Sequence, residues 1–430
     1  MKPQFLIAAP HSGAGKTTVT LGLLRSLQRK GLKVQPFKCG PDYIDPMHHT
    51  IAAGRPGINL DRFMMSDAHV QELYKRNIAD AGAGIIEGVM GLFDGSVKME
   101  GSSAALAAFL DVPVILVVNA KAMAYSAAAL LYGYKHFFKE ITIAGVIFNF
   151  VNTPSHYRIL REAAADIGIT ALGYLPVQDD IHIPSRHLGL HMPEDSGYEA
   201  VIDRAADHLE KHIDLDLLLQ LTLRPVREVS TSLPQTHRGK LRVGVAYDAA
   251  FNFIYPENVR AIASEVKYFS PLKDTVLPDV DLLYFPGGYP ELHLPALSAN
   301  TAMLQQLQQY SGKILAECGG MMYLGEAITD ESGQTFTMAG LLPVRTSMQH
   351  KKLSLGYRQV YIDNILLKGH EFHYSRYEKA PVIASADIRV LNARGETLDS
   401  PVFRTNNILA GYMHFYFGDN ADSLLDCLFV

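Results

Sequence analysis

The feature of this sequence that most constrains its fold is a series of short, continuous apolar runs separated by segments of helical length. In the first half of the chain these runs cover residues 5–9, 84–86, 112–118 and 143–148. Strands that are buried on both faces of a parallel sheet have this composition, because helices cover both faces of such a sheet. The pattern therefore predicts an α/β fold with a parallel sheet.

The same pattern predicts two domains. It stops after about residue 214 and resumes at Leu241, with further apolar runs at 281–285 and 312–316. The stretch 224–234 contains prolines, serines and a threonine, which is typical of a linker. A chain of 430 residues is also long enough for more than one domain. We predict an α/β domain over residues 1–225, a linker over 226–239 and a second α/β domain over 240–430.

Composition and charge exclude several classes of protein. The net charge of −5 argues against nucleic-acid binding, which usually needs a concentrated basic surface. The three cysteines, Cys39, Cys318 and Cys427, form neither a disulfide framework nor a zinc-binding pair. The N-terminus lacks the pattern of a signal peptide, and no apolar run approaches the roughly 20 residues of a membrane helix. We expect a soluble cytoplasmic protein that binds neither nucleic acid nor membrane.

A glycine-rich loop follows the first predicted strand. Residues 9–18 read APHSGAGKTT and open a predicted helix that runs to Lys30. Backbone N–H groups of such a loop, together with the helix N-terminus, bind phosphate oxygens. Lys16 would neutralise phosphate charge and the Thr17 hydroxyl would hold Mg²⁺. Pro10 stands where the general pattern has glycine, so a chance glycine turn is the alternative interpretation.

Two acidic clusters could complete a magnesium site. Glu87 ends the run at 84–86 and Asp94 follows in a loop with three glycines, at the edge where parallel sheets bind ligands. The segment KCGPDYIDP at 38–46 carries a lysine, a tyrosine and two carboxylates that could bind Mg²⁺ and an acidic substrate. Solvated loop carboxylates and ordinary turn chemistry are the alternatives.

Cys318 lies in the second half at the end of an apolar run and is followed by two glycines and a helical segment. This is the pattern of a nucleophile elbow, and the helix N-terminus is expected to lower the thiol pKa. Backbone N–H groups of Gly319 and of Gly288, in the earlier loop 285–291, would form an oxyanion hole. A core cysteine is the alternative.

The base for such a thiol should be a histidine. His414 lies late in the chain in a strand-like aromatic run, 411–417. A structural histidine is the alternative interpretation there. His370 and His373 are competitors, in a segment that we interpret as facing glutamine or an interface.

Together these motifs resemble the cobyrinate a,c-diamide synthase family over essentially the whole chain. The similarity lies in the segments 9–17, 38–46, 87–95, 246–255, 285–291, 316–320 and 369–375, and Pro10 is typical of this family. The resemblance implies a dethiobiotin-synthetase-like ATP domain followed by a class I-like glutamine amidotransferase domain. It also implies ATP- and glutamine-dependent amidation of the a and c acetate groups of cobyrinic acid through acyl phosphates, in cobalamin biosynthesis.

The resemblance assigns roles to individual residues. ATP would be bound by the loop and by an adenine-reading Asn149: Ser12, Gly13, Gly15, Lys16, Thr17, Thr18 and Asn149. Mg²⁺ would be held by Thr17, Asp42 and Glu87, with Asp42, Tyr43, Asp45 and Asp94 around the substrate carboxylate. Cys318 would be the glutaminase nucleophile and His414 its base. Class I enzymes commonly have a glutamate two residues after that histidine, where this chain has Tyr416. Domains of the first type often pair, which implies a homodimer.

Two alternatives remain at this point. The same amidation could act on hydrogenobyrinic acid or Ni-sirohydrochlorin. A partitioning-type regulatory P-loop ATPase is the alternative from another class, but it would have no use for Cys318 or His414.

Overall fold

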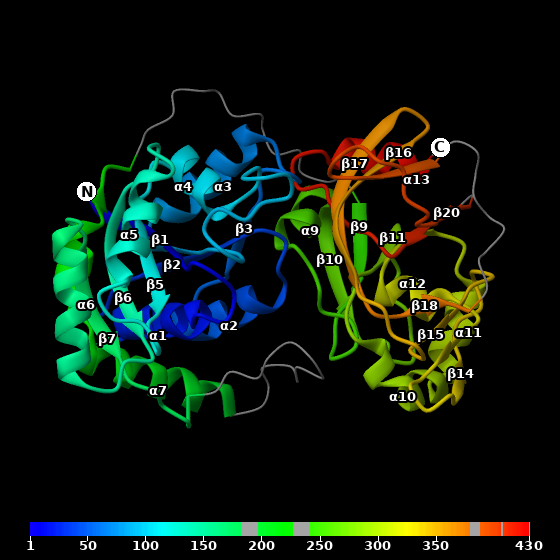
Figure 1. The fold of residues 1–430 in the computed structure, drawn as a ribbon. Helices are drawn as coiled ribbons and strands as arrows, with labels where there is room; N and C mark the ends of the chain where they lie inside the picture. The colour runs from blue at the N-terminus through cyan, green and yellow to red at the C-terminus, as the bar shows by residue number, and fades with distance from the viewer. Residues whose placement is uncertain (182–196, 227–240, 379–387, 406, 430) are drawn as a thin grey trace. The chain divides into compact units, whose positions relative to one another are not determined.

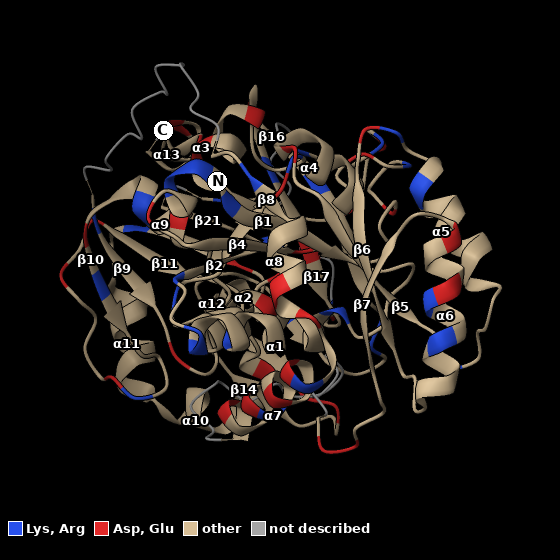
Figure 2. Ribbon diagram, turned by 90° about the vertical axis from the view of Figure 1, so that its left-hand side faces the viewer, with Lys and Arg blue, Asp and Glu red and all other residues tan. Residues whose placement is uncertain are grey.

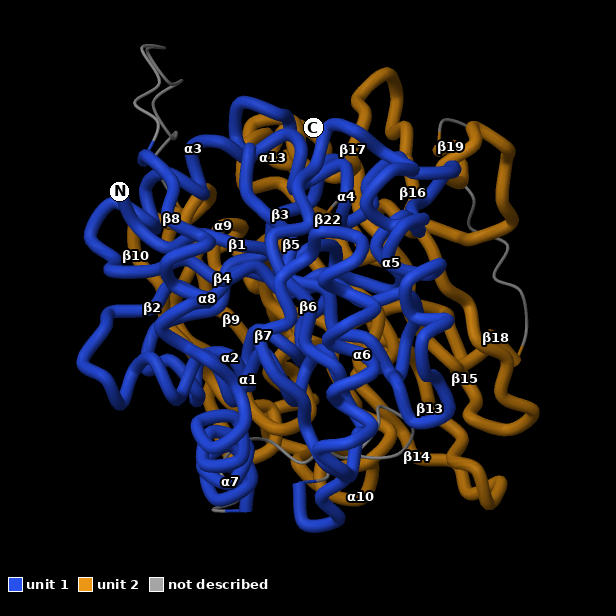
Figure 3. Tube along the Cα trace, turned by 60° about the vertical axis from the view of Figure 1, so that its left-hand side comes forward, with its two compact units in different colours: residues 1–62, 66–233 blue, residues 63–65, 234–430 orange. Residues whose placement is uncertain are grey.

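The computed structural model describes residues 1–181, 197–226, 241–378, 388–405 and 407–429. The chain divides into two compact units, one of residues 1–62 and 66–233 and the other of residues 63–65 and 234–430 (Figure 3). The predicted linker, from residue 227 onward, lies outside the described residues. Among the helices that are described, none is both long enough and apolar enough to cross a membrane.

The first unit is built on a parallel sheet with the strand order β3-β2-β4-β1-β5-β6-β7 (Figure 1). Its strands are β1 (Lys2–Ala8), β2 (Val34–Cys39), β3 (Ile58–Leu60), β4 (Ala83–Glu87), β5 (Val114–Asn119), β6 (Ile143–Asn149) and β7 (Thr170–Leu175). A short strand, β8 (Leu223–Arg224), pairs antiparallel with β1. Every predicted apolar run of this half lies within or overlaps one of these strands, so the predicted parallel sheet is confirmed.

Eight helices are described in the first unit. They are α1 (Lys16–Arg29), α2 (Ile44–Ala53), α3 (Asp67–Ile78), α4 (Ser103–Leu110), α5 (Ala127–His136), α6 (Pro154–Asp166), α7 (Gly197–His212) and α8 (Leu215–Leu221). Apolar side chains of α1, α7 and the central strands, including Phe5, Leu23 and Leu209, form one buried core. Acidic residues of α7, red in Figure 2, form ion pairs with Arg25 and Arg29 of α1. The phosphate-loop helix is therefore fixed on both its apolar and its charged side.

The second unit contains a sheet of order β10-β9-β11-β12-β21-β20, parallel except for its last pair. Its strands are β9 (Leu241–Ala246), β10 (Ala263–Phe269), β11 (Leu282–Phe285), β12 (Lys313–Glu317), β20 (Val402–Arg404) and β21 (Ile408–Gly411). Its described helices are α9 (Pro256–Ile262), the 3₁₀ helix η1 (Pro290–Leu292), α10 (Leu294–Ala299), α11 (Thr301–Gln309), α12 (Gly319–Leu324) and α13 (Ala421–Phe429). This half is α/β as predicted.

Two smaller sheets in the second unit were not predicted from the sequence. One has the order β14-β13-β15-β18 and the other, antiparallel, the order β19-β16-β17-β22. The strands are β13 (Ala327–Thr329), β14 (Thr335–Thr337), β15 (Arg345–Ser347), β16 (Ser354–Ile362), β17 (Ile365–His373), β18 (Arg376–Tyr377), β19 (Ile388–Asn392) and β22 (His414–Tyr416). Several are only two or three residues long, too short to give a periodic signal.

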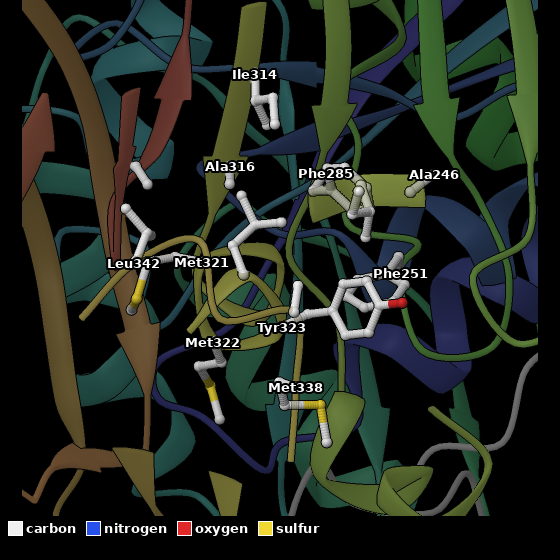
Figure 4. Close-up of a cluster of buried hydrophobic side chains, with 14 of the residues drawn as sticks. Ala246, Phe251, Phe285, Ile314, Ala316, Met321, Met322, Tyr323, Met338 and Leu342 are labelled. Atoms are coloured by element: carbon white, nitrogen blue, oxygen red, sulfur yellow. The ribbon is translucent and has the colours of Figure 1, made fainter. Parts of the chain in front are cut away.

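A buried cluster anchors the short helix α12 to the larger sheet. Met321 and Tyr323 of α12 lie fully buried beside Phe251 and Phe285 (Figure 4). The rings of Phe251 and Tyr323 are 5.4 Å apart. Because α12 has only six residues, this packing rather than helix propensity must hold it in place.

Candidate functional site

The predicted phosphate loop joins the end of β1 to the start of α1. Gly13 and Gly15 have φ values of 80° and 95°, in the left-handed region that favours glycine. A Cβ atom on Gly15 would lie 2.2 Å from Nδ2 of Asn149, whose amide donates a hydrogen bond of 2.9 Å to the carbonyl of Ala14. The structure therefore brings the predicted adenine-reading residue, at the end of β6, directly against the loop.

A cavity of about 320 Å³ opens beside Gly15 and Asn149, and Thr18, Phe150 and His208 also line it. Its volume lies within the range of small-molecule sites. The cavity contains both apolar and amide groups, which a nucleotide base requires for stacking and for hydrogen bonding. Ser12 and Gly13 are exposed at the tip of the loop.

Lys16 and Thr17 begin α1 and point toward the acidic segment after β4. The Lys16 ammonium donates a 2.6 Å hydrogen bond to the carbonyl of Met90, and the Thr17 hydroxyl donates one of 2.7 Å to Glu87 Oε1. Both acceptors follow from the topology, because β4 lies next to β1 and their carboxyl ends share one edge of the sheet. The predicted association of Thr17 with Glu87 is thus present in the structure.

Glu87 lies in a buried cluster of charges. The Lys38 ammonium is 2.5 Å from Asp45 Oδ2, 3.4 Å from Glu87 Oε1 and 3.9 Å from Asp42 Oδ2, and His49 Nε2 is 2.6 Å from Glu87 Oε2. Burial alone would raise the pKa of Glu87, but Lys38 and His49 outweigh burial and Asp45, so the pKa is lowered. Glu87 is therefore held as a carboxylate.

His49 is a functional candidate that the sequence analysis missed, and Lys38, which it placed in the 38–46 segment without a specific role, lies at the centre of the cluster. His49 lies four residues after Asp45 in α2, so both side chains project from one face of that helix toward Glu87. The helical spacing was the signal that could have identified His49. The signal for Lys38 was its position at the carboxyl end of β2, the neighbour of β4.

The oxygen atoms near the loop fit Mg²⁺. The Thr17 hydroxyl and the Glu87 carboxylate are hard oxygen ligands, and Mg²⁺ usually keeps several waters and takes further oxygens from phosphates. Within the described parts of the chain, no group of three or more histidine, cysteine, aspartate or glutamate side chains is arranged around a common metal position. The predicted ligands Thr17, Asp42 and Glu87 could hold Mg²⁺ together with water and nucleotide oxygens.

Asp42 and Asp94 also shape their own loops. Asp42 Oδ1 accepts hydrogen bonds from the N–H groups of Ile44 and Asp45, at 3.0 and 3.2 Å, at the start of α2. Asp94 is exposed, and its Oδ2 accepts a hydrogen bond of 2.9 Å from Gly91 N–H. Tyr43 is buried beside Asp42. Asp42, Tyr43 and Asp45 therefore lie with Lys38 in one cluster, whereas Asp94 lies in the glycine loop after β4.

Cys318 has the backbone geometry of a nucleophile elbow. Its φ of 47° and ψ of −108° are strained for a residue with a Cβ, and it connects β12 to α12. Its N–H donates a 2.7 Å hydrogen bond to Gly411, which helps to hold the strained turn. A Cβ on Gly319 would lie 3.2 Å from the nitrogen of Gly288. The two predicted oxyanion donors, Gly288 and Gly319, are therefore neighbours next to the thiol.

The expected lowering of the thiol pKa is wrong for this structure. Burial raises the pKa of Cys318 well above its ordinary value, and nearby Glu291 raises it further, while the Gly319 N–H opposes the rise only in part. The helix that follows has six residues, so its N-terminus contributes too little to offset burial. The thiol therefore needs a base to remove its proton.

His414 lies in β22 and is 1% exposed. A Cβ on Gly287 would lie 2.2 Å from its Cε1 atom, so the imidazole borders the same 287–288 loop as Gly319. Burial, and then the nearby His370 and His373, hold the pKa of His414 well below its ordinary value. Its imidazole is therefore neutral at pH 7 and can accept a proton.

The two competing histidines have different surroundings. His370 stacks on His414 with ring centroids 5.0 Å apart, and burial and then Arg358 lower its pKa to about 3. His373 stacks on Tyr412 with centroids 3.7 Å apart, and its Nδ1 donates to the carbonyl of Ser375. The structure thus places His370 beside the predicted base.

Comparisons with known proteins agree with the two sites. Residues 5–190 match the family described as the CobQ/CobB/MinD/ParA nucleotide binding domain. Residues 242–422 match the family described as the CobB/CobQ-like glutamine amidotransferase domain. The phosphate loop, Asn149 and the Lys38–Glu87 cluster lie within the first match, and the thiol site lies within the second.

Relatives align with this sequence over almost its whole length. Hydrogenobyrinate a,c-diamide synthase of Brucella suis biovar 1 is 42% identical over 95% of this chain and 97% of its own length. The protein of the same name in Pseudomonas aeruginosa is 41% identical over 97% of this chain and 95% of its own. Cobyrinate a,c-diamide synthase of Picrophilus torridus is 40% identical over 96% of each chain. The chain therefore belongs to the cobyrinate and hydrogenobyrinate a,c-diamide synthase family of glutamine-hydrolysing ligases.

Proposed function

We propose that this chain converts the a and c acetate carboxylates of cobyrinic acid into amides, with ATP as the activating substrate and glutamine as the source of ammonia. The observation that carries the proposal is that one chain holds two sites. One is a phosphate loop whose Thr17 bonds Glu87 of the Lys38–Glu87 cluster, and the other is a strained Cys318 elbow that borders the same 287–288 loop as His414. Neither site alone would account for glutamine-dependent amide synthesis.

The first unit would activate the carboxylate. A carboxylate resists ammonia because hydroxide is a poor leaving group, whereas phosphate is a good one. The substrate carboxylate attacks the γ-phosphorus of ATP, ADP leaves, and ammonia then attacks the acyl carbon and releases phosphate. Lys16 and Lys38 would stabilise negative charge on the transferring group and on the substrate carboxylate. Mg²⁺ held by Thr17 and Glu87 would neutralise charge on the phosphates.

The second unit would release ammonia from glutamine. His414 takes the thiol proton as Cys318 attacks the side-chain amide carbonyl, and the N–H groups of Gly288 and Gly319 stabilise the oxyanion. The imidazolium then gives its proton to the departing ammonia, which leaves a thioester. Water hydrolyses the thioester to glutamate and restores the thiol.

Hydrogenobyrinic acid is the second candidate substrate, because relatives that are 40–42% identical carry that name. The two macrocycles differ in whether cobalt is present. Parallel assays with cobyrinic and hydrogenobyrinic acid, ATP, Mg²⁺ and glutamine, followed by mass spectrometry, test the proposal. We expect two amides on the preferred acid. Amidation of neither acid, with ammonia also supplied, would contradict the proposed function.

A further inference from the structure

The strand that carries His414 is at the edge of its sheet. In the order β19-β16-β17-β22, β22 pairs antiparallel with β17 and places His414 opposite His370. In an antiparallel pair, alternate residues turn their N–H and C=O groups to opposite edges of the strand. Phe415 therefore turns its backbone groups away from β17, toward an edge on which no strand is described in residues 241–378, 388–405 and 407–429.

Two fully buried side chains hold this free edge. Glu317 Oε1 accepts a 2.9 Å hydrogen bond from the N–H of Phe415. Asn258 donates a 2.8 Å hydrogen bond to the carbonyl of Phe415 and accepts one of 2.9 Å from the N–H of Phe417. Buried backbone groups are costly to leave without a partner, so these side chains replace the missing strand.

Glu317 also connects the histidine strand to the nucleophile. It is the last residue of β12, one position before Cys318, and its Oε2 accepts a 2.7 Å hydrogen bond from the hydroxyl of Tyr284 in β11. The Glu317 carboxylate therefore connects β12, which ends just before Cys318, to both β11 and β22. A shorter side chain at this position would lose its reach to Phe415.

We infer that Glu317 is a positioning residue for His414, holding the backbone of the base in register with Cys318 through the N–H of Phe415. Burial raises the pKa of Glu317 to about 8, although Tyr284 and the Phe415 N–H oppose the rise. Both described contacts of the Glu317 side chain are hydrogen bonds that it accepts from uncharged donors, so the inference requires an acceptor of the right length at this position.

The inference rests on the proposed roles of Cys318 and His414, and a matched pair of variants separates length from charge. Glu317→Asp keeps the carboxylate but is one carbon too short to reach Phe415. Glu317→Gln loses the charge but keeps an acceptor at the same reach. The measurements are kcat and KM for glutamine hydrolysis, together with amide formation from ammonia in the same full-length proteins.

We expect Glu317→Asp to lower kcat for glutamine hydrolysis by on the order of a hundredfold with KM little changed, because the base is displaced while glutamine still binds. Glu317→Gln should stay close to wild type. Both variants should form amides from ammonia like wild type, because the activation site lies in the other unit.

Equal glutaminase activity in the two variants, or a larger loss in Glu317→Gln, would overturn the inference. If Glu317→Asp does not fold, two other variants decide. A lowered kcat for glutamine hydrolysis in Glu317→Gln overturns the inference. A normal kcat in Tyr284→Phe supports it, because the contact with Phe415 is then the one that positions His414. Wild-type protein that makes no amide from ammonia would instead count against the proposed function, while the glutaminase comparison would still decide the role of Glu317.

Discussion

At the scale of single residues, we expect substitution of Lys38 to have the largest effect on stability. Lys38 is the cation among Asp42, Asp45 and Glu87, and it is buried with them. Lys38→Met should lower the free energy of unfolding by about 3–5 kcal/mol, because it leaves buried carboxylates unpaired, and should abolish amide formation from ammonia. Urea denaturation and the ammonia assay check this.

Lys30 offers a matched control for Lys38. It pairs with Asp216 at 2.9 Å, but both side chains are exposed. Lys30→Met should change stability by no more than about 0.5 kcal/mol. If Lys38→Met lowers the free energy of unfolding no more than Lys30→Met does, the proposed role of the Lys38–Glu87 cluster in stability is contradicted.

The buried histidines predict a pH dependence. Because the pKa of His370 is lowered from about 6.5 to about 3, the unfolded chain binds more protons at acidic pH and stability falls as pH falls through 6.5. Between pH 7 and pH 5 the wild type should lose about 2 kcal/mol through His370 alone.

Urea unfolding at both pH values tests this dependence. His370→Gln should show a correspondingly smaller drop, while His350→Gln, at an exposed position, serves as the control. Equal pH slopes in wild type and His370→Gln would contradict the prediction.

At the scale of elements, the phosphate loop depends on glycine at position 15. Gly15→Ala would strain a φ of 95° and place a Cβ 2.2 Å from Asn149, so ATP affinity should fall and stability should drop by about 1–3 kcal/mol. Gly133→Ala, in α5 with nothing within 4 Å of its Cβ position, should instead stabilise by about 0.5–1 kcal/mol. Nucleotide titrations and melting curves compare the two variants. An unchanged ATP affinity in Gly15→Ala would contradict the proposed nucleotide site.

The sequence predicted those elements that are determined by residues close together in the chain. The apolar strands of the first sheet, the glycine loop before α1 and the cysteine elbow after β12 each depend on neighbouring residues, and each is present. The acceptor role of Glu317 depends on a strand about a hundred residues away, and the Lys38–Glu87 pair depends on the register of β2 and β4. The strand-like run at 411–417 was predicted and contains β22, but its pairing with β17 and the side chains that bond its other edge come from distant parts of the chain, so the sequence did not show them.

At the scale of the whole molecule, two units with separate cores divide one reaction. Carboxylate activation belongs to the first unit and ammonia release to the second. Substitutions at Lys16 should therefore remove amide formation from either nitrogen source, whereas substitutions at Cys318 should remove only the glutamine-dependent reaction.

The most direct test of this division is to follow nitrogen from glutamine labelled with ¹⁵N in its side-chain amide. Wild-type protein with ATP, Mg²⁺ and the corrin acid should give a product that carries ¹⁵N in two new amides. Cys318→Ala should give none from labelled glutamine, yet should form the same diamide from ¹⁵N-ammonia. Label transfer that persists in Cys318→Ala, or a diamide that stays unlabelled in wild type, would contradict the account.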